Sequence, residues 1–176
     1  MYDISIVNWL HNHTIPYSIP VLQVISYTTT YVSILLAVSV LITSFINRSK
    51  ELRRKFYILA IVLIMVAIVS QGLKAVIVRD RPFETYSDIE KLSQAGGSSF
   101  PSGHTLEAFA MAAAMSFLFR RKRMAIAIFS WAFLVAYSRM VLGVHYPSDV
   151  LAGMLIGGFI GWVVPWIFNR FIYNKI

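Results

Sequence analysis

Three short groups of polar residues interrupt an otherwise apolar chain, and their side chains together suit the removal of a phosphate from an ester. The groups are Lys74 with Arg81-Pro82, then Pro101-Ser102-Gly103-His104, then Arg139 with His145 and Asp149. Fixed cations stabilise the negative charge of a phosphoryl group during its transfer, and an imidazole can act as nucleophile or as general acid. The set supplies three cations, two imidazoles and one carboxylate.

The first group is expected to present two cations at one end of a membrane span. Lys74 and Arg81 are seven residues apart, which is nearly two helical turns, so a continuous helix would carry them on one face. Pro82 disfavours helix at Arg81 and is expected to end the span there. Lys74 lies inside an apolar stretch, where a cation usually faces a polar cavity. The alternative is that these charges only set topology, and for Arg79 we prefer that alternative.

The second group has the features of a helix start that binds an anion. Pro101 suits the first turn of a helix, and Gly103 allows another group to approach the backbone closely. The free N–H groups at a helix N-terminus attract anions, and His104 would lie beside them. The alternative is an ordinary helix start with an interfacial histidine. Glu107 follows one turn later, either as a group that tunes His104 or binds substrate, or as a buried carboxylate paired with a cation.

The third group is expected to hold an oriented histidine. Asp149 follows His145 by four residues at the start of an apolar run, where the N-terminus of a helix favours a carboxylate. We expect Asp149 to accept a hydrogen bond from one nitrogen of His145, which would leave the other nitrogen free to attack. The alternative makes Asp149 a helix cap and Arg139 a membrane anchor.

The elements that must position these residues are apolar helices. Hydrophobic residues make up 57% of the 176 residues, against about 45–50% in soluble domains. The excess lies in five runs long enough to cross a bilayer, near Val24–Ile46, Phe56–Val78, Phe100–Phe119, Met124–Val144 and Val150–Tyr173. We therefore predict an all-α fold, a polytopic transmembrane helical bundle of about five spans, as a single domain over residues 1–176. The absence of cysteine excludes disulfides and thiol nucleophiles.

The positive charges predict how the bundle is oriented. The net charge is +8, and eleven of the sixteen Lys and Arg residues follow the first and third runs or lie at the end of the fifth. This clustering in short loops fits the positive-inside rule better than a nucleic-acid face, so we assign those loops to the cytoplasm and expect no nucleic-acid partner. The N-terminus would then lie outside and the C-terminus inside, with the three polar groups near the outer surface.

Two further segments are expected on that outer side. Residues 1–23 contain no Lys or Arg, and their apolar side chains suggest a short helix lying in the membrane interface, with a frayed tail as the alternative. A sixth span there is a further alternative. Residues 79–99 form the longest polar segment, and a loop of this length is often functional.

Taken together, the three groups resemble the signature of the type 2 phosphatidic acid phosphatase superfamily. That signature consists of Lys, six residues and Arg-Pro, then Pro-Ser-Gly-His, then Ser-Arg, five residues, His, three residues and Asp. The chain carries it as Lys74 to Arg81-Pro82, Pro101 to His104, and Ser138-Arg139 to His145 and Asp149. Every signature position is present. Many members of the family have six spans, one more than predicted here.

The resemblance implies roles for these residues. His145 would be the nucleophile that forms a phosphohistidine, Asp149 its orienting partner, and His104 the general acid for the leaving oxygen. The phosphate would be bound by Lys74, Arg81, Ser102, Gly103 and Arg139. The family needs no metal, so neither a metal site nor any other cofactor is expected.

The resemblance also implies a substrate class and a location. The expected protein is a lipid phosphatase of the bacterial inner membrane, acting on the periplasmic or extracellular side, with a polyisoprenyl diphosphate such as undecaprenyl diphosphate preferred. Phosphatidylglycerol phosphate, phosphatidic acid and lipid A are rival substrates, and the loop 82–99 is expected to select among them. A lipid phosphotransferase and a non-enzymatic membrane protein are the other classes, while the apolar spans oppose a soluble haloperoxidase. The expected partners are the lipid substrate and the bilayer, with no obligate protein partner.

Overall fold

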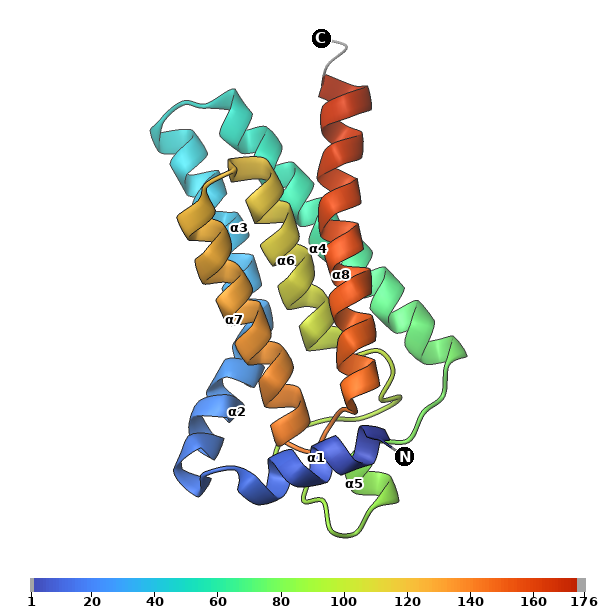
Figure 1. Ribbon diagram of the computed structural model, residues 1–176. Coiled ribbons are helices and arrows are strands. Elements are labelled where there is room, and N and C mark those ends of the chain that lie inside the picture. The colour runs from blue at the N-terminus through green and yellow to red at the C-terminus, as the bar shows by residue number, and fades with distance from the viewer. Residues whose placement is uncertain (1, 174–176) are drawn as a thin grey trace.

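The structure is a computed structural model that describes residues 2–173, and this part of the chain is helical without any strand (Figure 1). Its helices are α1 (Tyr2–His13), a 3-10 turn (Pro16–Ser18), α2 (Ile19–Tyr27), α3 (Thr29–Ile46), α4 (Lys50–Val76), α5 (Pro82–Thr85), α6 (Gly103–Phe119), α7 (Lys122–Val141), α8 (Pro147–Ile167) and a π-helical turn (Phe168–Tyr173). The predicted all-α bundle is therefore confirmed.

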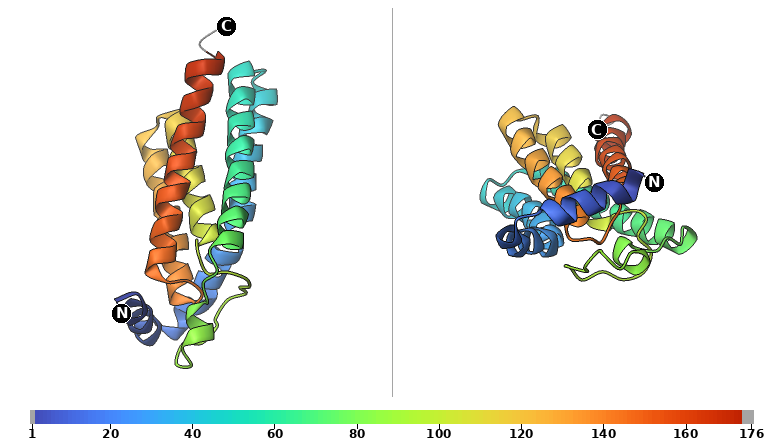
Figure 2. Two further views of the ribbon diagram at one scale, coloured as in Figure 1. Left: turned by 90° about the vertical axis from the view of Figure 1, so that its right-hand side faces the viewer. Right: turned by 60° about the horizontal axis from the view of Figure 1, so that its bottom comes forward.

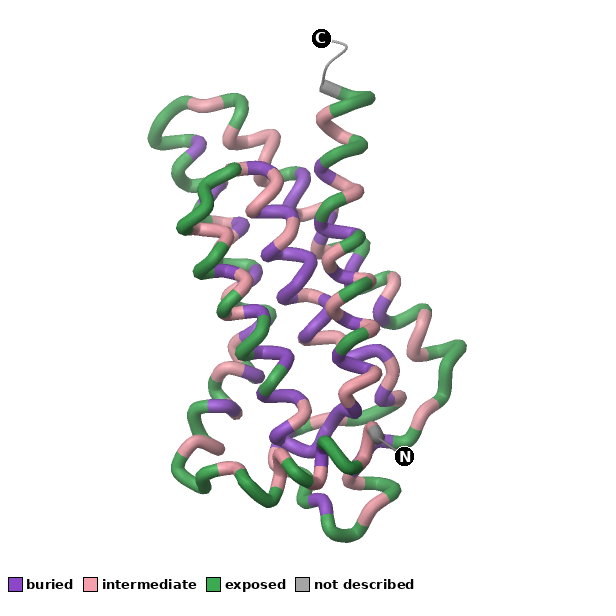
Figure 3. Tube along the Cα trace, in the orientation of Figure 1, coloured by how far each residue is buried: buried purple, intermediate pink, exposed green. Residues whose placement is uncertain are grey.

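Five long helices run side by side and form the bundle, as two views of it agree (Figures 1 and 2). Four of them are long and apolar enough to cross a membrane, namely α3, α4, α7 and α8 with its π-helical extension. The fifth, α6, has 17 residues, of which 10 are buried, and lies in the middle of the bundle (Figure 3). The first predicted run is divided at Thr28, because α2 ends there before α3 begins.

The α6 and α8 helices pack closely because α8 presents glycines to α6. A Cβ added to Gly157 would lie 2.2 Å from the carbonyl oxygen of Leu106, and one added to Gly161 would lie 2.2 Å from that of Ala110. Small residues at this spacing let two helix backbones approach more closely than any side chain would allow. The contact fixes the start of α6, which carries His104, against the start of α8, which carries Asp149.

The two ends of the bundle differ in charge. The α3–α4 turn, the α6–α7 turn and the C-terminal end of α8 lie at one end, and the segment between α4 and α6 and the α7–α8 turn lie at the other (Figure 1). The first end therefore carries the basic clusters that begin at Arg48 and Arg120. Lys175, which belongs to the same predicted set, lies outside the described residues. The alternation of charge is thus borne out, while the side of the membrane stays a prediction.

The N-terminal segment forms a helix that crosses the end opposite the basic clusters (Figure 2). Val7 of α1 is fully buried and packs in one cluster with Ile89 and Tyr146. Helix α1 is thus held against the protein, so the alternative of a frayed tail is wrong for residues 2–13. Its position in a membrane interface remains a prediction.

Candidate active site

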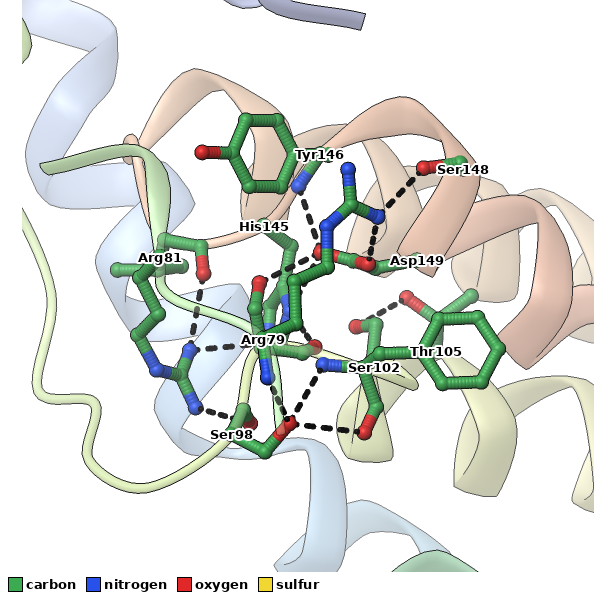
Figure 4. Close-up of polar contacts among 12 residues, drawn as sticks. Arg79, Arg81, Ser98, Ser102, Thr105, His145, Tyr146, Ser148 and Asp149 are labelled. Carbon is green, nitrogen blue, oxygen red and sulfur yellow. Dashed lines mark hydrogen bonds and ion pairs between the residues drawn. The ribbon is translucent and has the colours of Figure 1, made fainter. Parts of the chain in front are cut away.

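His145 lies in the turn between α7 and α8, where the residue is 1% exposed. Gly143 forms this turn with a φ of 71°, and a Cβ there would lie 2.7 Å from the carbonyl oxygen of Glu90. The Nδ1 atom of His145 lies 2.8 Å from the Ser99 carbonyl oxygen, which can only accept. Nε2 lies 3.3 Å from a nitrogen of Arg81, which can only donate. Nδ1 therefore carries the proton, and Nε2 presents a lone pair (Figure 4).

The expected hydrogen bond between Asp149 and His145 is not formed, and that prediction is corrected. Asp149 Oδ2 lies 3.7 Å from His145 Nδ1, which is beyond hydrogen-bond distance. The same oxygen accepts instead from the Ser99 hydroxyl at 2.5 Å and from the Tyr146 N–H at 2.9 Å. The Ser99 carbonyl has taken the place predicted for the carboxylate. The predicted outcome, one fixed tautomer with a free second nitrogen, is nevertheless reached.

Burial keeps His145 neutral. Desolvation by burial lowers the pKa of His145 to about 3, against the opposing influence of Asp149. The charges of Arg139 and Arg81 lower the pKa further. Because this value lies below the ordinary pKa of 6.5, the lone pair of Nε2 stays available across the neutral range.

Arg81 contacts His145 from the start of α5, and not from a continuation of α4 as predicted from the sequence. Helix α4 ends at Val76, and an extended segment then leads to Arg81 at the start of α5. The two cations of the first group therefore do not share a helix face, and that reasoning is wrong although both come to the same end of the bundle. The helix ends early because Ile77 turns to an extended conformation and the Ser98 hydroxyl donates to its carbonyl at 2.6 Å.

The guanidinium of Arg81 is 2% exposed and all five of its N–H groups have partners. Four of them donate to the carbonyl oxygens of Gly96, Gly97, Ser98 and Val144. These bonds tie the loop before α6 to the turn that carries His145. The fifth N–H group faces Nε2 of His145. It is therefore the donor that could bind an anion arriving at this nitrogen.

The other predicted residues lie around the start of α6. Lys74, Gly103 and His104 line a cleft of about 330 Å³. A Cβ added to Gly103 would lie 3.8 Å from Nζ of Lys74. Ser102 is buried, with its hydroxyl 2.9 Å from that of Thr105 and its N–H bonded to the Asp149 carbonyl at 3.1 Å. His104 interacts electrostatically with His145 and with the cations Lys74, Arg81 and Arg139. The eight predicted residues thus gather at one end of the bundle.

Arg139 is buried in α7, and part of its guanidinium has no partner. One terminal nitrogen donates to the hydroxyl of Ser26 and lies 3.4 Å from that of Ser93. Its Nε atom is buried and has no hydrogen-bond partner among residues 2–173. A buried donor without a partner costs free energy, so Arg139 has an N–H available for a ligand.

Glu107 lines the same cleft and is not paired with a cation among the described residues. Its Oε2 atom accepts from the Thr30 hydroxyl at 2.8 Å, and its Oε1 atom is buried without a partner in the described part of the chain. No ion pair to Glu107 is formed among these residues. The alternative of a carboxylate paired with a cation is therefore wrong, and the position in the cleft favours contact with a ligand.

Sequence reasoning missed two residues that hold the histidine and its carboxylate. Arg79 donates to Asp149 Oδ1 at 2.6 Å, although its charge was interpreted as a topology signal. Ser99 supplies the carbonyl for His145 and the hydroxyl for Asp149. The proximity of Arg79 to Arg81 was the only available signal for it, while Ser99 offered none beyond its place before Pro101.

The described residues hold no group of three His, Cys, Asp or Glu side chains placed to bind a metal ion. Chemistry without a metal remains a prediction from the family resemblance.

Comparison with known proteins identifies the family. The model of the PAP2 superfamily matches residues 55–173, which include all three polar groups and helices α6 to α8. The chain therefore belongs to the PAP2 superfamily, as the resemblance predicted.

Curated relatives fall into several lipid phosphatase groups. The lipid A 4'-phosphatase of Bacteroides thetaiotaomicron is 44% identical over 75 residues, which cover 43% of this chain and 33% of that protein. The undecaprenyl-diphosphatase BcrC of Bacillus subtilis is 35% identical over 83 residues, which cover 47% of this chain and 42% of that protein. The matches thus span between a third and a half of these relatives' lengths.

Two solved structures share the fold over most of the chain. LpxE of Aquifex aeolicus superposes with a TM-score of 0.80 at 27% identity, covering 93% of this chain and 94% of that one. The PAP2-type phosphatidylglycerolphosphate phosphatase of Bacillus subtilis gives a TM-score of 0.80 at 23% identity, covering 98% and 87%. The membrane bundle is therefore that of PAP2 phosphatases, and the chain is a multi-pass membrane protein.

Proposed function

We propose that the protein is a lipid phosphatase that removes the terminal phosphate of a membrane lipid through a phosphohistidine at His145. The observation that carries this proposal is the buried, neutral imidazole whose Nδ1 is held by the Ser99 carbonyl and whose Nε2 faces a cation. A nucleophile fixed in one tautomer beside a positive charge suits attack on a phosphoryl group. Membership of the PAP2 superfamily supports the same activity.

The proposed reaction has two steps. Nε2 of His145 attacks the terminal phosphorus and forms an N–P bond, while the bond from that phosphorus to the leaving oxygen breaks and His104 donates a proton to that oxygen. The leaving group is a lipid alkoxide from a phosphate monoester and a lipid phosphate from a diphosphate. Water then attacks the phosphohistidine, His104 accepts the proton from the water, and inorganic phosphate leaves as His145 is regenerated. Asp149, at 3.7 Å from Nδ1, stabilises the positive charge that the imidazole gains in the first step.

The phosphate would be bound by the residues predicted from the sequence. Arg81 would exchange its contact with Nε2 for a phosphate oxygen, and Arg139 would use its unpartnered Nε. Lys74 would contact the group from the cleft side, with the N–H of Gly103 at the start of α6 and Ser102 beside it. Because these donors are fixed by the fold, they stabilise the transition state without rearranging during the reaction.

The cleft supports a lipid substrate. It is lined by Lys74, Gly103 and His104 at one end and by apolar side chains of α3 and α4 deeper in the bundle, including Ile34, Leu63 and Val66. A lipid could thus place its phosphate at the histidines and its apolar tail in the cleft between the helices. The reaction would take place on the outer side of the bacterial inner membrane, as the charge pattern predicts, with the N-terminus outside and the C-terminus inside.

Within this class, undecaprenyl diphosphate is the preferred substrate of the proposal, supported by the relative BcrC of Bacillus subtilis. Lipid A phosphate is the second candidate, because a specific observation favours it. The cleft that His104 lines also carries Thr30, Gln71 and Glu107, and Oε1 of Glu107 has no partner among the described residues. These groups would suit hydroxyls and amides next to the phosphate, which a prenyl chain lacks.

Phosphate release by the purified protein from a panel of lipids tests both candidates. The panel contains undecaprenyl diphosphate, lipid A, phosphatidylglycerol phosphate and phosphatidic acid in detergent micelles, and the products are free phosphate and the lipid with one phosphate fewer. We expect the highest kcat/KM for undecaprenyl diphosphate. A phosphorylated acceptor in place of free phosphate would indicate a phosphotransferase, and no release from any lipid would refute the proposal.

The variant Glu107→Gln separates the two candidates within the same panel. If lipid A is the substrate, we expect kcat/KM for lipid A to fall about 10-fold or more, since a hydrogen bond to a charged group contributes about 1.5–3 kcal/mol. If undecaprenyl diphosphate is the substrate, its kcat/KM should change little. Comparison of the two lipids on one preparation controls for any loss of folded protein.

A further inference from the structure

Arg79 joins three separate parts of the chain beside the proposed nucleophile (Figure 4). One terminal nitrogen donates to Asp149 Oδ1 at 2.6 Å and to the Ser148 hydroxyl at 2.7 Å, and the other donates to Asp3 of helix α1 at 3.0 Å. The guanidinium carbon lies 4.1 Å from the centre of the Tyr146 ring. The side chain is thus held by ion pairs with two carboxylates and by an aromatic face.

Arg79 is bonded both to Ser99, which contacts the imidazole, and to Asp149, whose carboxylate lies 3.7 Å from it. Its side chain occupies one oxygen of Asp149, and its main-chain carbonyl accepts the N–H of Ser99 at 2.8 Å. Ser99 in turn accepts from His145 and donates to the other oxygen of Asp149. Asp149 is fully buried, so the loss of Arg79 would leave a buried carboxylate without its only cationic partner among the described residues.

Helix α1 reaches the same point through Asp3. One oxygen of Asp3 accepts the N–H of Ser148 at 3.1 Å, and the other accepts from the Ser148 hydroxyl and from Arg79. Asp3 therefore satisfies a free N–H in the first turn of α8, one residue before Asp149. Although partial burial opposes it, hydrogen bonds from Ser148 and Arg79 hold the pKa of Asp3 below its ordinary value, so Asp3 stays an anion near neutral pH.

Arg79 differs from Lys74, Arg81 and Arg139 because it is paired with carboxylates of the protein. The residues that line the cleft include Lys74, Gly103 and His104, but Arg79 lies with Asp3 and Tyr146 around a separate hollow on the outer surface. Its charge is shared between two carboxylates, whereas Arg81 and Arg139 form no ion pair within residues 2–173. Arg79 is therefore suited to hold protein groups and not to bind the phosphate.

We propose that Arg79 is a positioning residue for the reaction, which acts on His145 through Asp149 and Ser99, and that Asp3 of helix α1 fixes Arg79 for this task. The N-terminal helix then belongs to the catalytic apparatus and is more than a surface anchor. This inference rests on the proposed phosphatase function. Because Arg79 does not contact substrate, its loss should lower kcat and leave KM nearly unchanged.

The test compares four variants of the full chain with dioctanoyl phosphatidic acid in detergent micelles as the probe. Arg79→Met should lower kcat about 10- to 100-fold, the range found when the partner that orients a metal-ligating side chain is lost, with KM within about 2-fold of wild type. Arg79→Lys should recover part of kcat, because an ammonium can still pair with Asp149. Asp3→Asn should lower kcat by a smaller factor in the same sense, and should have no further effect in the Arg79→Met background.

Asp88→Asn is the matched control for a purely mechanical role of α1. Asp88 accepts a hydrogen bond from Asn8 of α1 at 3.2 Å, so this variant also neutralises a carboxylate that contacts α1 but leaves Arg79 intact. Its kcat should equal that of wild type. Activities are normalised to monodisperse folded protein, and thermal unfolding is measured for each variant.

Three results would overturn the inference. These are a kcat of wild-type size in Arg79→Met, an equal loss in Asp88→Asn and Asp3→Asn, or a rise in KM with kcat unchanged. If wild-type protein releases no phosphate from the probe or from any lipid of the panel, the proposed function itself fails and the inference falls with it. The inference is supported if wild type and Asp88→Asn are equally active while Arg79→Met has a lower kcat.

Discussion

Replacing His145 with alanine is expected to abolish phosphate release from every lipid that the wild-type protein hydrolyses. The reason is that Nε2 of His145 is the proposed nucleophile, and alanine leaves no group that could form the covalent intermediate. Loss of a nucleophile that acts with a general acid typically costs about 10⁶-fold in kcat. Steady-state release of phosphate, measured with the best lipid of the panel, checks this prediction.

His13→Ala is the control for the histidine substitution. His13 is exposed at the end of α1, where its only side-chain hydrogen bond within residues 2–173 is to the Trp9 carbonyl, so its removal should leave activity unchanged. Monodisperse elution and thermal unfolding show whether His145→Ala keeps its fold. Turnover within a few-fold of wild type in folded His145→Ala would contradict the assigned role.

Replacing Gly157 with alanine is expected to separate α6 from α8 and to destabilise the protein strongly. The added Cβ would lie 2.2 Å from the Leu106 carbonyl oxygen and 2.9 Å from its carbonyl carbon. Both are backbone atoms, which cannot move away as a flexible side chain can. Overpacking of a close contact costs about 1–3 kcal/mol and sometimes more. We also expect phosphate release to fall, since the same contact sets His104 against Asp149.

Gly158→Ala provides a neighbouring control on the same helix. No atom lies within 4 Å of a Cβ added to Gly158, and alanine favours helix over glycine by about 1 kcal/mol. Thermal unfolding in detergent should therefore give a lower Tm for Gly157→Ala and an equal or higher Tm for Gly158→Ala. Equal Tm values for the two variants would show that the close approach of α6 and α8 does not hold.

The sequence allowed the residues of the site to be predicted because their types are rare in apolar runs. A cation, imidazole or carboxylate inside such a run is costly unless it serves a site, so Lys74, His104 and Asp149 stood out individually. The order of the helices also followed from the alternation of apolar runs and basic loops. The family resemblance then supplied roles, which spacing alone could not.

Local contacts that depend on the folded loops could not be predicted. The end of α4 at Val76 depends on the Ser98 hydroxyl, which binds the carbonyl of Ile77 from 21 residues away along the chain. The carbonyl that orients His145 belongs to Ser99, and a backbone oxygen carries no signal in the sequence. Arg79 looked like any charge near a membrane boundary, and only the fold brings it to both Asp3 and Asp149.

The most direct test of the account is to locate the phosphate on the enzyme during turnover. The protein is mixed with an active lipid phosphate, quenched within milliseconds under alkaline conditions that preserve phosphohistidine, digested and analysed by mass spectrometry. The account predicts one phosphorylated residue, His145, and no phosphoenzyme in His145→Ala. Phosphate on another side chain of the active wild-type protein would contradict it.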